Sequence, residues 1–151
     1  NHTGAFYCYS DDLPLPTLTL DGSVHYLHAE YSEGALEQFK VVLAPDWSGS
    51  LAATLVLPVA GGNAYLRTDY SFMGDHYTNP TYQPPEAKQD RELVNVRLGW
   101  RNDSWDAAIW ARNITDESYS TLAAAPFLLT GMTAQFLQPP RTYGVTARYS
   151  F

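Results

Sequence analysis

The sequence predicts an all-β protein, an antiparallel up-and-down meander of about six strands. Three observations favour this fold class. Apolar and polar residues alternate with period two along most of the chain, helical periodicity is nearly absent, and turn-forming residues separate the alternating runs. The 151 residues also include 11 Tyr, although charged residues make up only 17%. A sheet with one polar face in contact with water and one apolar face accommodates that composition.

Six successive runs each present an apolar face and a polar face. In chain order, the apolar positions are Leu18, Leu20, Val24 and Tyr26; Leu51, Ala53, Leu55, Leu57 and Val59; Ala64, Leu66, Thr68, Tyr70 and Phe72; Val94, Val96, Leu98 and Trp100; Trp105, Ala107, Ile109 and Ala111; Tyr143, Val145, Ala147, Tyr149 and Phe151. The opposite face is repeatedly charged in mid-strand, at Arg67, Asp69, Arg97, Asp106, Arg112 and Arg148. Opposite charges placed in this way are expected to form a cross-strand ladder.

The connections between the runs alternate in length. The short ones are Leu13–Pro16, Ala60–Asn63 and Arg101–Ser104. The long ones are Ser32–Asp46, His76–Asp90 and Asp116–Pro140. Short turns on one side and long loops on the other are typical of outer-membrane barrels. Aromatic residues also gather near the strand ends, as they do at membrane interfaces. The meander is therefore expected to be a segment of a transmembrane β-barrel.

Composition excludes several other classes. Nine Lys and Arg against 16 Asp and Glu give a net charge of −7, which disfavours nucleic acid as a partner. No apolar run reaches the ~18–20 residues of a membrane-spanning helix. Cys8 is the only cysteine, so neither an intrachain disulfide nor a multi-cysteine zinc site is expected.

Candidate catalytic and metal-binding groups are weak. His25 and His28 have the odd spacing that places two residues on opposite faces of a strand, so a shared metal is not expected. The adjacent acids Asp11–Asp12 and Asp116–Glu117 are typical of solvated strand ends. No nucleophile, base and orienting group stand together. We therefore expect a protein that is not an enzyme and has no cofactor and no metal site.

Two motifs near the C-terminus resemble those of TonB-dependent outer-membrane receptors. The run Trp105–Tyr119 leads into Asn-Ile-Thr-Asp-Glu-Ser-Tyr, similar to the family's penultimate-strand signature Asn-Leu-[Thr/Phe]-Asp-x-x-Tyr. The matching positions are Asn113, Ile114, Thr115, Asp116 and Tyr119. Pro140-Arg-Thr-Tyr-Gly144, followed by an alternating strand closed by Phe151, is similar to the family's C-terminus. Leu43–Trp47 resembles a family strand start, and the resemblance covers about Leu13 to Phe151.

This resemblance implies a domain organisation and a function. Residues 13–151 would be the C-terminal portion of a receptor barrel without its plug domain, and residues 1–12 an atypical lead-in that could form a partial strand. The family takes up scarce nutrients such as ferric siderophores across the outer membrane of Gram-negative bacteria. Its partners are outer-membrane lipid, the rest of the barrel with its plug, and the TonB protein, which acts through that plug.

The resemblance also implies two kinds of site. In outer-membrane proteins the last strand is the signal for the barrel-assembly machinery, which here would be Tyr143, Val145, Ala147, Tyr149 and Phe151. The outer loops contact the ligand, and the positions here that could do so are Tyr82, Phe127, Met132 and Phe136. The same loop residues could instead pack on neighbouring loops.

Two alternatives remain open at this level. A small stand-alone outer-membrane barrel resembling a porin would need an even number of at least about eight strands. A soluble β-sandwich binding module would pack the face of Val94, Val96, Leu98 and Trp100 on a second sheet. For a barrel segment of about six strands, in contrast, open edges in hydrocarbon would leave backbone groups unpaired. We expect such a chain to be insoluble or to depend on detergent.

Overall fold

The computed structural model describes residues 3–7, 15–31, 37, 41–59, 61–78, 88–127 and 132–151, with the side chains of residues 3–7, 121–127 and 132–135 excepted. Its described part is all-β. The strands are β1 (Thr3–Tyr7), β2 (Thr17–Tyr26), β3 (Trp47–Val59), β4 (Gly62–Tyr77), β5 (Lys88–Arg101), β6 (Trp105–Arg112), β7 (Ser120–Phe127), β8 (Met132–Leu137) and β9 (Thr142–Tyr149). No helix in this part is long and apolar enough to cross a bilayer.

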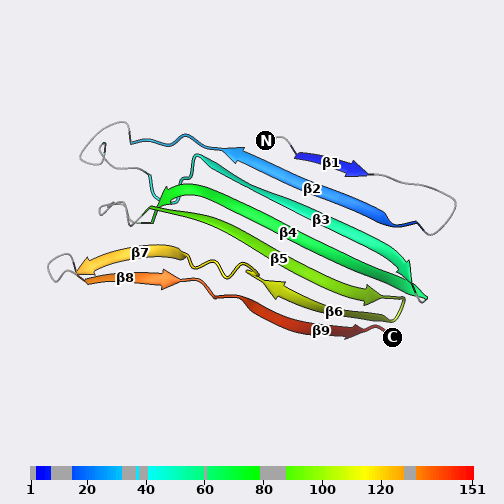
Figure 1. Ribbon diagram of the computed structural model, residues 1–151. Helices are drawn as coiled ribbons and strands as arrows, with labels where there is room; N and C mark the ends of the chain where they lie inside the picture. Colours follow the sequence, from blue (N-terminus) through cyan, green and yellow to red (C-terminus); the bar gives the residue numbers. More distant parts are fainter. Residues whose placement is uncertain are drawn as a thin grey trace.

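Seven of the strands form one open antiparallel sheet in the order β1-β2-β3-β4-β5-β6-β9 (Figure 1). The expected antiparallel meander of six strands is confirmed, since β2 to β6 and β9 each pair with their neighbours along the chain or across the β7–β8 insertion. The short strand β1 adds a seventh strand at one edge, inside the atypical lead-in, where it pairs with β2.

Two of the three predicted short connections, Ala60–Asn63 and Arg101–Ser104, are tight turns, whereas Leu13–Pro16 belongs to a longer connection between Tyr7 and Thr17 that lies mostly outside the described residues. The tight turn between Val59 and Gly62 and the turn between Arg101 and Trp105 lie at the same end of the sheet as the C-terminus (Figure 1). Gly61 adopts φ 69° in the first turn, a conformation that suits glycine. Asn102 closes the second turn, because its Oδ1 accepts hydrogen bonds from the backbone N–H of Ser104 and Trp105 at 3.0 and 2.7 Å.

The long connections differ from expectation at two places. Asp116–Pro140 is not a loop alone, because β7 and β8 pair within it as an antiparallel hairpin (Figure 1). The connection His76–Asp90 is shorter than predicted, because β4 runs on to Tyr77 and β5 begins at Lys88 after an irregularity between Met73 and His76. Most of Ser32–Asp46 lies outside the described residues, as do residues 79–87.

The strand register places the predicted apolar positions that lie within strands on one face of the sheet, and Phe151 lies beyond the end of β9. One row of partners crosses six strands as Leu18, Leu55, Leu66, Leu98, Ile109 and Val145. The next row contains Leu20, Ala53, Thr68, Val96, Ala111 and Tyr143. A slip of one residue in any pairing would turn that strand's apolar side chains to the other face, so the shared pattern specifies the register.

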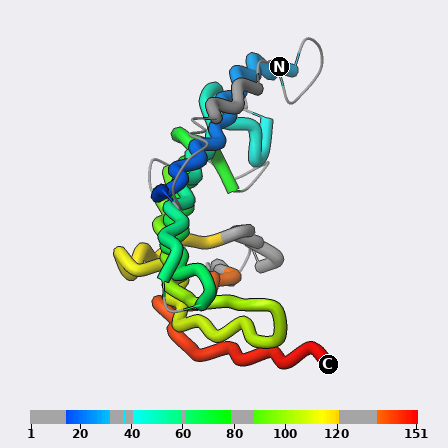
Figure 2. The backbone as a smooth tube through the Cα atoms, turned by 90° about the vertical axis from the view of Figure 1, so that its right-hand side faces the viewer, coloured from blue at the N-terminus to red at the C-terminus, as the bar shows by residue number. Residues whose placement is uncertain are grey.

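This apolar face is not covered by any other part of the described chain. The strands form a single layer when viewed from the side (Figure 2). Ala108, 4% exposed, is the only hydrophobic residue buried in the described part, whereas Ile109 and Val145 are 56% and 77% exposed. The β7–β8 hairpin is not the second sheet of a β-sandwich on this face, because in the described part of the chain β7 and β8 pack mainly against each other and not across the strands of the seven-stranded sheet.

Candidate functional site

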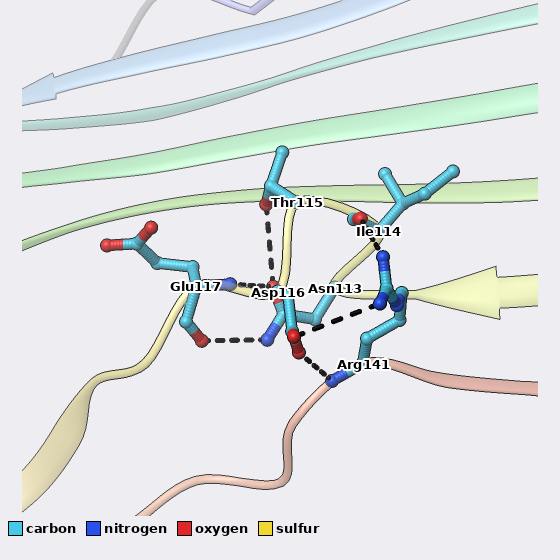
Figure 3. Close-up of polar contacts among 6 residues, drawn as sticks. All are labelled: Asn113, Ile114, Thr115, Asp116, Glu117 and Arg141. Atoms are coloured by element: carbon cyan, nitrogen blue, oxygen red, sulfur yellow. Dashed lines mark hydrogen bonds and ion pairs between the residues drawn. The ribbon is translucent and has the colours of Figure 1, made fainter.

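The turn that follows β6 is closed by the side chain of Asn113 and is joined to β5 through the Asn113 backbone. This residue is buried and adopts φ 51°, a left-handed conformation that Asn tolerates better than most residues. Its Oδ1 accepts the backbone N–H of Glu117 at 2.9 Å, and its Nδ2 donates to the Glu117 carbonyl oxygen at 2.8 Å (Figure 3). The Asn113 backbone N–H in turn donates to Asn95 Oδ1 on β5 at 3.0 Å.

Asp116 extends this turn to the start of the last strand. Its Oδ1 accepts the backbone N–H of Arg141 at 2.9 Å, and its Oδ2 lies 3.9 Å from Arg141 Nη2 (Figure 3). Arg141 Nη1 also donates to the Ile114 carbonyl oxygen at 3.5 Å. The residues of the Asn-Ile-Thr-Asp motif thus bring β5, β6 and the start of β9 together, which gives the motif a structural role in registering the last strand.

Tyr119, the last motif residue, lies at a different place. The guanidinium carbon of Arg91 is 5.1 Å from the centre of its ring, and its carbonyl oxygen accepts the backbone N–H of Gln138 at 3.0 Å. Tyr119 therefore connects β5 with the base of the β7–β8 hairpin. The sequence motif consequently corresponds to two structural units, a turn at Asn113–Glu117 and a hairpin base at Tyr119.

The final strand forms an edge of the sheet, and its apolar side chains are open. Tyr143 and Val145 lie on the apolar face at 79% and 77% exposure, with Ala147 and Tyr149 on the same face. The Tyr149 ring lies 4.9 Å from that of Trp105 and 6.3 Å from that of Phe151. The sheet ends there, so β9 leaves one side of its backbone unpaired within the described chain.

The four proposed ligand-contact positions do not form a common site in the described structure. Tyr82 lies outside the described residues, and so do the side chains of Phe127 and Met132. The backbones of Phe127 and Met132 are partners at the tip of the β7–β8 hairpin. Phe136 is an exposed residue of β8.

Aromatic side chains form a belt at each end of the apolar face. One belt contains Tyr26 and Trp47, whose ring centres are 4.9 Å apart, and Tyr70 and Phe72, at 6.2 Å. The other belt contains Trp100, Trp105, Tyr149 and Phe151. Between the belts the face carries no charged residue, and Glu92, the partner of Phe72, lies level with the first belt.

The opposite face carries the charged residues that the alternation predicts. Arg67 donates from Nε and Nη2 to the two carboxylate oxygens of Asp69, at 3.1 and 2.5 Å. Arg97 Nη2 lies 3.7 Å from Asp106 Oδ1, and Tyr65 Oη lies between them, donating to Asp106 at 2.9 Å and accepting from Arg97 Nε at 3.1 Å. The Arg67–Asp69 pair therefore lies along β4, whereas the Arg97–Asp106 pair crosses from β5 to β6, as the predicted ladder requires.

Beyond the belt of Tyr70 and Phe72, the β4–β5 hairpin continues as a polar extension. Lys88 Nζ pairs with Asp75 Oδ2 at 2.5 Å. This hydrogen bond raises the pKa of Lys88; its partial loss of hydration opposes the rise, and the charges of Asp75, Tyr77 and Asp90 add smaller increases. Both side chains are solvent-exposed.

Comparisons of this chain with protein-family models, with curated proteins and with solved structures find no match.

Proposed function

We propose that this chain is a segment of an outer-membrane β-barrel from a TonB-dependent receptor, with its apolar face in lipid and its polar face toward the barrel lumen. The observation that carries this proposal is the uncovered apolar face, six strands wide and without charge between its aromatic belts. Large exposed apolar patches mark surfaces that another phase or partner covers. Lipid suits this one because its two ends carry tyrosine and tryptophan.

The dimensions of the face support lipid as its covering. On β4 the two belts are eight residues apart, from Phe72 to Ala64, the partner of Trp100. At about 3.4 Å per residue this spacing corresponds to about 27 Å along the strand, comparable with the ~25 Å apolar band of outer-membrane barrels.

The receptor assignment is supported by the sequence motifs and by their place in the sheet. The Asn113–Asp116 turn connects the end of β6 to the start of β9, and β9 presents alternating apolar side chains at a sheet edge. In the proposed receptor the chain supplies one part of the wall of a barrel that takes up a scarce nutrient such as a ferric siderophore. The two open edges, β1 and β9, would pair with the rest of that barrel.

A pair of arginine substitutions on neighbouring residues tests the membrane placement. Leu18 and Thr17 are both exposed in the sheet, and they point to its apolar and polar faces respectively. Arginine on the lipid face of a barrel near the bilayer midplane destabilises it by about 2–4 kcal/mol. We expect Leu18→Arg to lower the stability of the chain folded into liposomes by that amount, and Thr17→Arg to change it by less than about 0.5 kcal/mol.

Urea unfolding from lipid vesicles, followed by tryptophan fluorescence, measures both variants. A soluble sheet whose apolar face is open to water would tolerate the two substitutions equally, and equal effects would therefore contradict the lipid placement. Folding of the wild-type chain in detergent-free buffer as a stable monomer would contradict it as well.

A further inference from the structure

The polar face of the sheet is positively charged, although the whole chain has a net charge of −7. Across β2 to β6 and β9 the charged residues on this face are Arg67, Arg91, Arg97, Arg101, Arg112, Arg148, Asp21, Asp69 and Asp106. This surface therefore carries six arginines and three aspartates. Acidic residues dominate the chain elsewhere, so the excess of positive charge is specific to this surface.

Two of these arginines lie directly opposite each other. Arg67 on β4 and Arg97 on β5 are register partners, and like charges at such positions destabilise a sheet. Asp69 engages Arg67, and Asp106 with Tyr65 engages Arg97. The two carboxylates offset the repulsion from the sides, but each is already occupied by its own arginine.

Arg112 extends the positive charge to β6. Its guanidinium carbon lies 5.3 Å from the centre of the Trp110 ring, and the Trp110 indole is held in turn by a hydrogen bond from Nε1 to Thr146 Oγ1 at 3.1 Å. Within the described residues Arg112 has no carboxylate partner. A guanidinium stacked on an aromatic ring is restrained by its face, while the N–H groups in its plane remain suited to a planar oxyanion.

These side chains surround a hollow of about 620 Å³, a volume that falls within the range of small-molecule sites. Its polar lining includes Arg67, Asp69, Asn95, Arg97 and Arg112, with the Trp110 indole beside them. Three arginines against one aspartate give the hollow a positive charge. Convergent arginines in a concave surface are the arrangement that proteins use for carboxylate and phosphate groups.

We propose that this hollow binds a small solute that carries two or more oxyanion groups, with Arg112 and Arg97 as its principal ligands. The two guanidinium groups approach the hollow from adjacent strands, so one solute with two separated negative groups contacts both. Trp110 acts as a positioning residue, because it holds Arg112 by stacking. The site is independent of the proposed membrane function, since it requires only the register of β4, β5, β6 and β9.

Binding to the refolded 151-residue chain tests this site, with inorganic tripolyphosphate and citrate as probes and spermidine as the cationic control. Isothermal titration calorimetry measures the affinity for each probe, and a change in Trp110 fluorescence reports binding in the hollow. We expect saturable binding of at least one anionic probe and none of spermidine. The stronger of the two probes identifies phosphate or carboxylate as the preferred group.

Two substitutions that remove the same charge locate the site. Arg112→Gln should weaken binding of the stronger probe by about tenfold, since it removes a charge-assisted contact. Arg148→Gln removes an arginine from the same face outside the hollow, and should change the affinity by less than about twofold. Arg112→Lys keeps the charge without the planar fork and should weaken binding by about threefold, and it serves where the glutamine variant does not fold.

Three results would overturn the proposal. These are the absence of saturable anion binding by the wild-type chain, equal losses in Arg112→Gln and Arg148→Gln, or an unchanged affinity in both Arg112 variants. Equal losses would indicate that the face attracts anions only through its overall charge. None of these results bears on the lipid placement of the opposite face, which the Leu18 and Thr17 variants test separately.

Discussion

The indole of Trp110 lies across Gly144, its register partner on the neighbouring strand β9. A Cβ atom added to Gly144 would lie 2.5 Å from Trp110 Cζ2 and 2.9 Å from Cε2. The absence of a side chain at Gly144 is therefore what lets the ring lie over the adjacent strand. Tyr65 lies over Gly99 and Phe72 over Gly49 in the same way.

Alanine substitutions at two strand glycines test this packing. Gly144→Ala should lower the free energy of unfolding by about 1–3 kcal/mol, because the added methyl group must displace the Trp110 ring. Gly22→Ala is the matched control, because its Cβ would lie 3.5 Å from its nearest neighbour, Leu51 Cδ1. That variant should be neutral or stabilised by about 0.4–1 kcal/mol.

Denaturant unfolding in one detergent measures both variants. The Trp110 emission spectrum should also change in Gly144→Ala and stay as in the wild type in Gly22→Ala. If both variants lost the same stability, glycine would be needed for strand flexibility in general, and the ring contact would have no special role.

The sequence predicted the two faces correctly because side-chain direction in a strand depends only on position. Leu66 and Arg67, for example, are neighbours in sequence and must point to opposite faces. The contact of Trp110 with Gly144 could not be predicted in the same way, because it depends on the register between strands that are 34 residues apart in the numbering.

The hairpin of β7 and β8 was missed for a different reason. Its residues Ser120–Phe127 include three consecutive alanines and a proline, which gives neither a clear alternation nor a strong strand preference.

The sequence also did not predict the hollow beside Arg112. The sequence placed Arg67, Arg97 and Arg112 on one face, but it could not show that only Asp69 among the acids would share their hollow.

The conformation of Asn113 leads to a second prediction. Asn113→Ala removes both side-chain hydrogen bonds to Glu117 and leaves alanine with a left-handed backbone. It should cost about 1–3 kcal/mol of stability. Asn113→Gly relieves the backbone conformation alone and should recover part of the loss. Thermal unfolding with Ser118→Ala as the exposed control measures these effects, and a neutral Asn113→Ala would mean that the turn does not stabilise the sheet.

The pair of Lys88 and Asp75 gives a prediction about pH. Because the pKa of Lys88 is raised in the folded chain, its stabilising contribution is complete below the unfolded value of about 10.5 and is lost as pH rises through the folded pKa. Asp75→Asn should lower the pKa of Lys88 toward about 10.5. Asp90→Asn should lower it less, because Asp90 makes the smallest of the contributions. NMR titration of the Lys88 side chain measures both shifts, and an equal fall in both variants would contradict the role of the hydrogen bond.

The last residue gives a prediction that separates assembly from stability. Phe151 is fully exposed and contacts the sheet through the Tyr149 ring, 6.3 Å away, so its removal should change the stability of the refolded chain by less than about 0.5 kcal/mol.

If the final strand is recognised through its aromatic face by the barrel-assembly machinery, removal of Phe151 from the complete receptor should nevertheless lower the amount inserted in the outer membrane severalfold. Ser150→Ala, in the same segment, is the control and should leave the amount unchanged. Surface labelling of cells measures insertion, and ligand affinity per inserted receptor should stay constant. A receptor without Phe151 that reached wild-type surface levels would show that this residue is not part of the assembly signal.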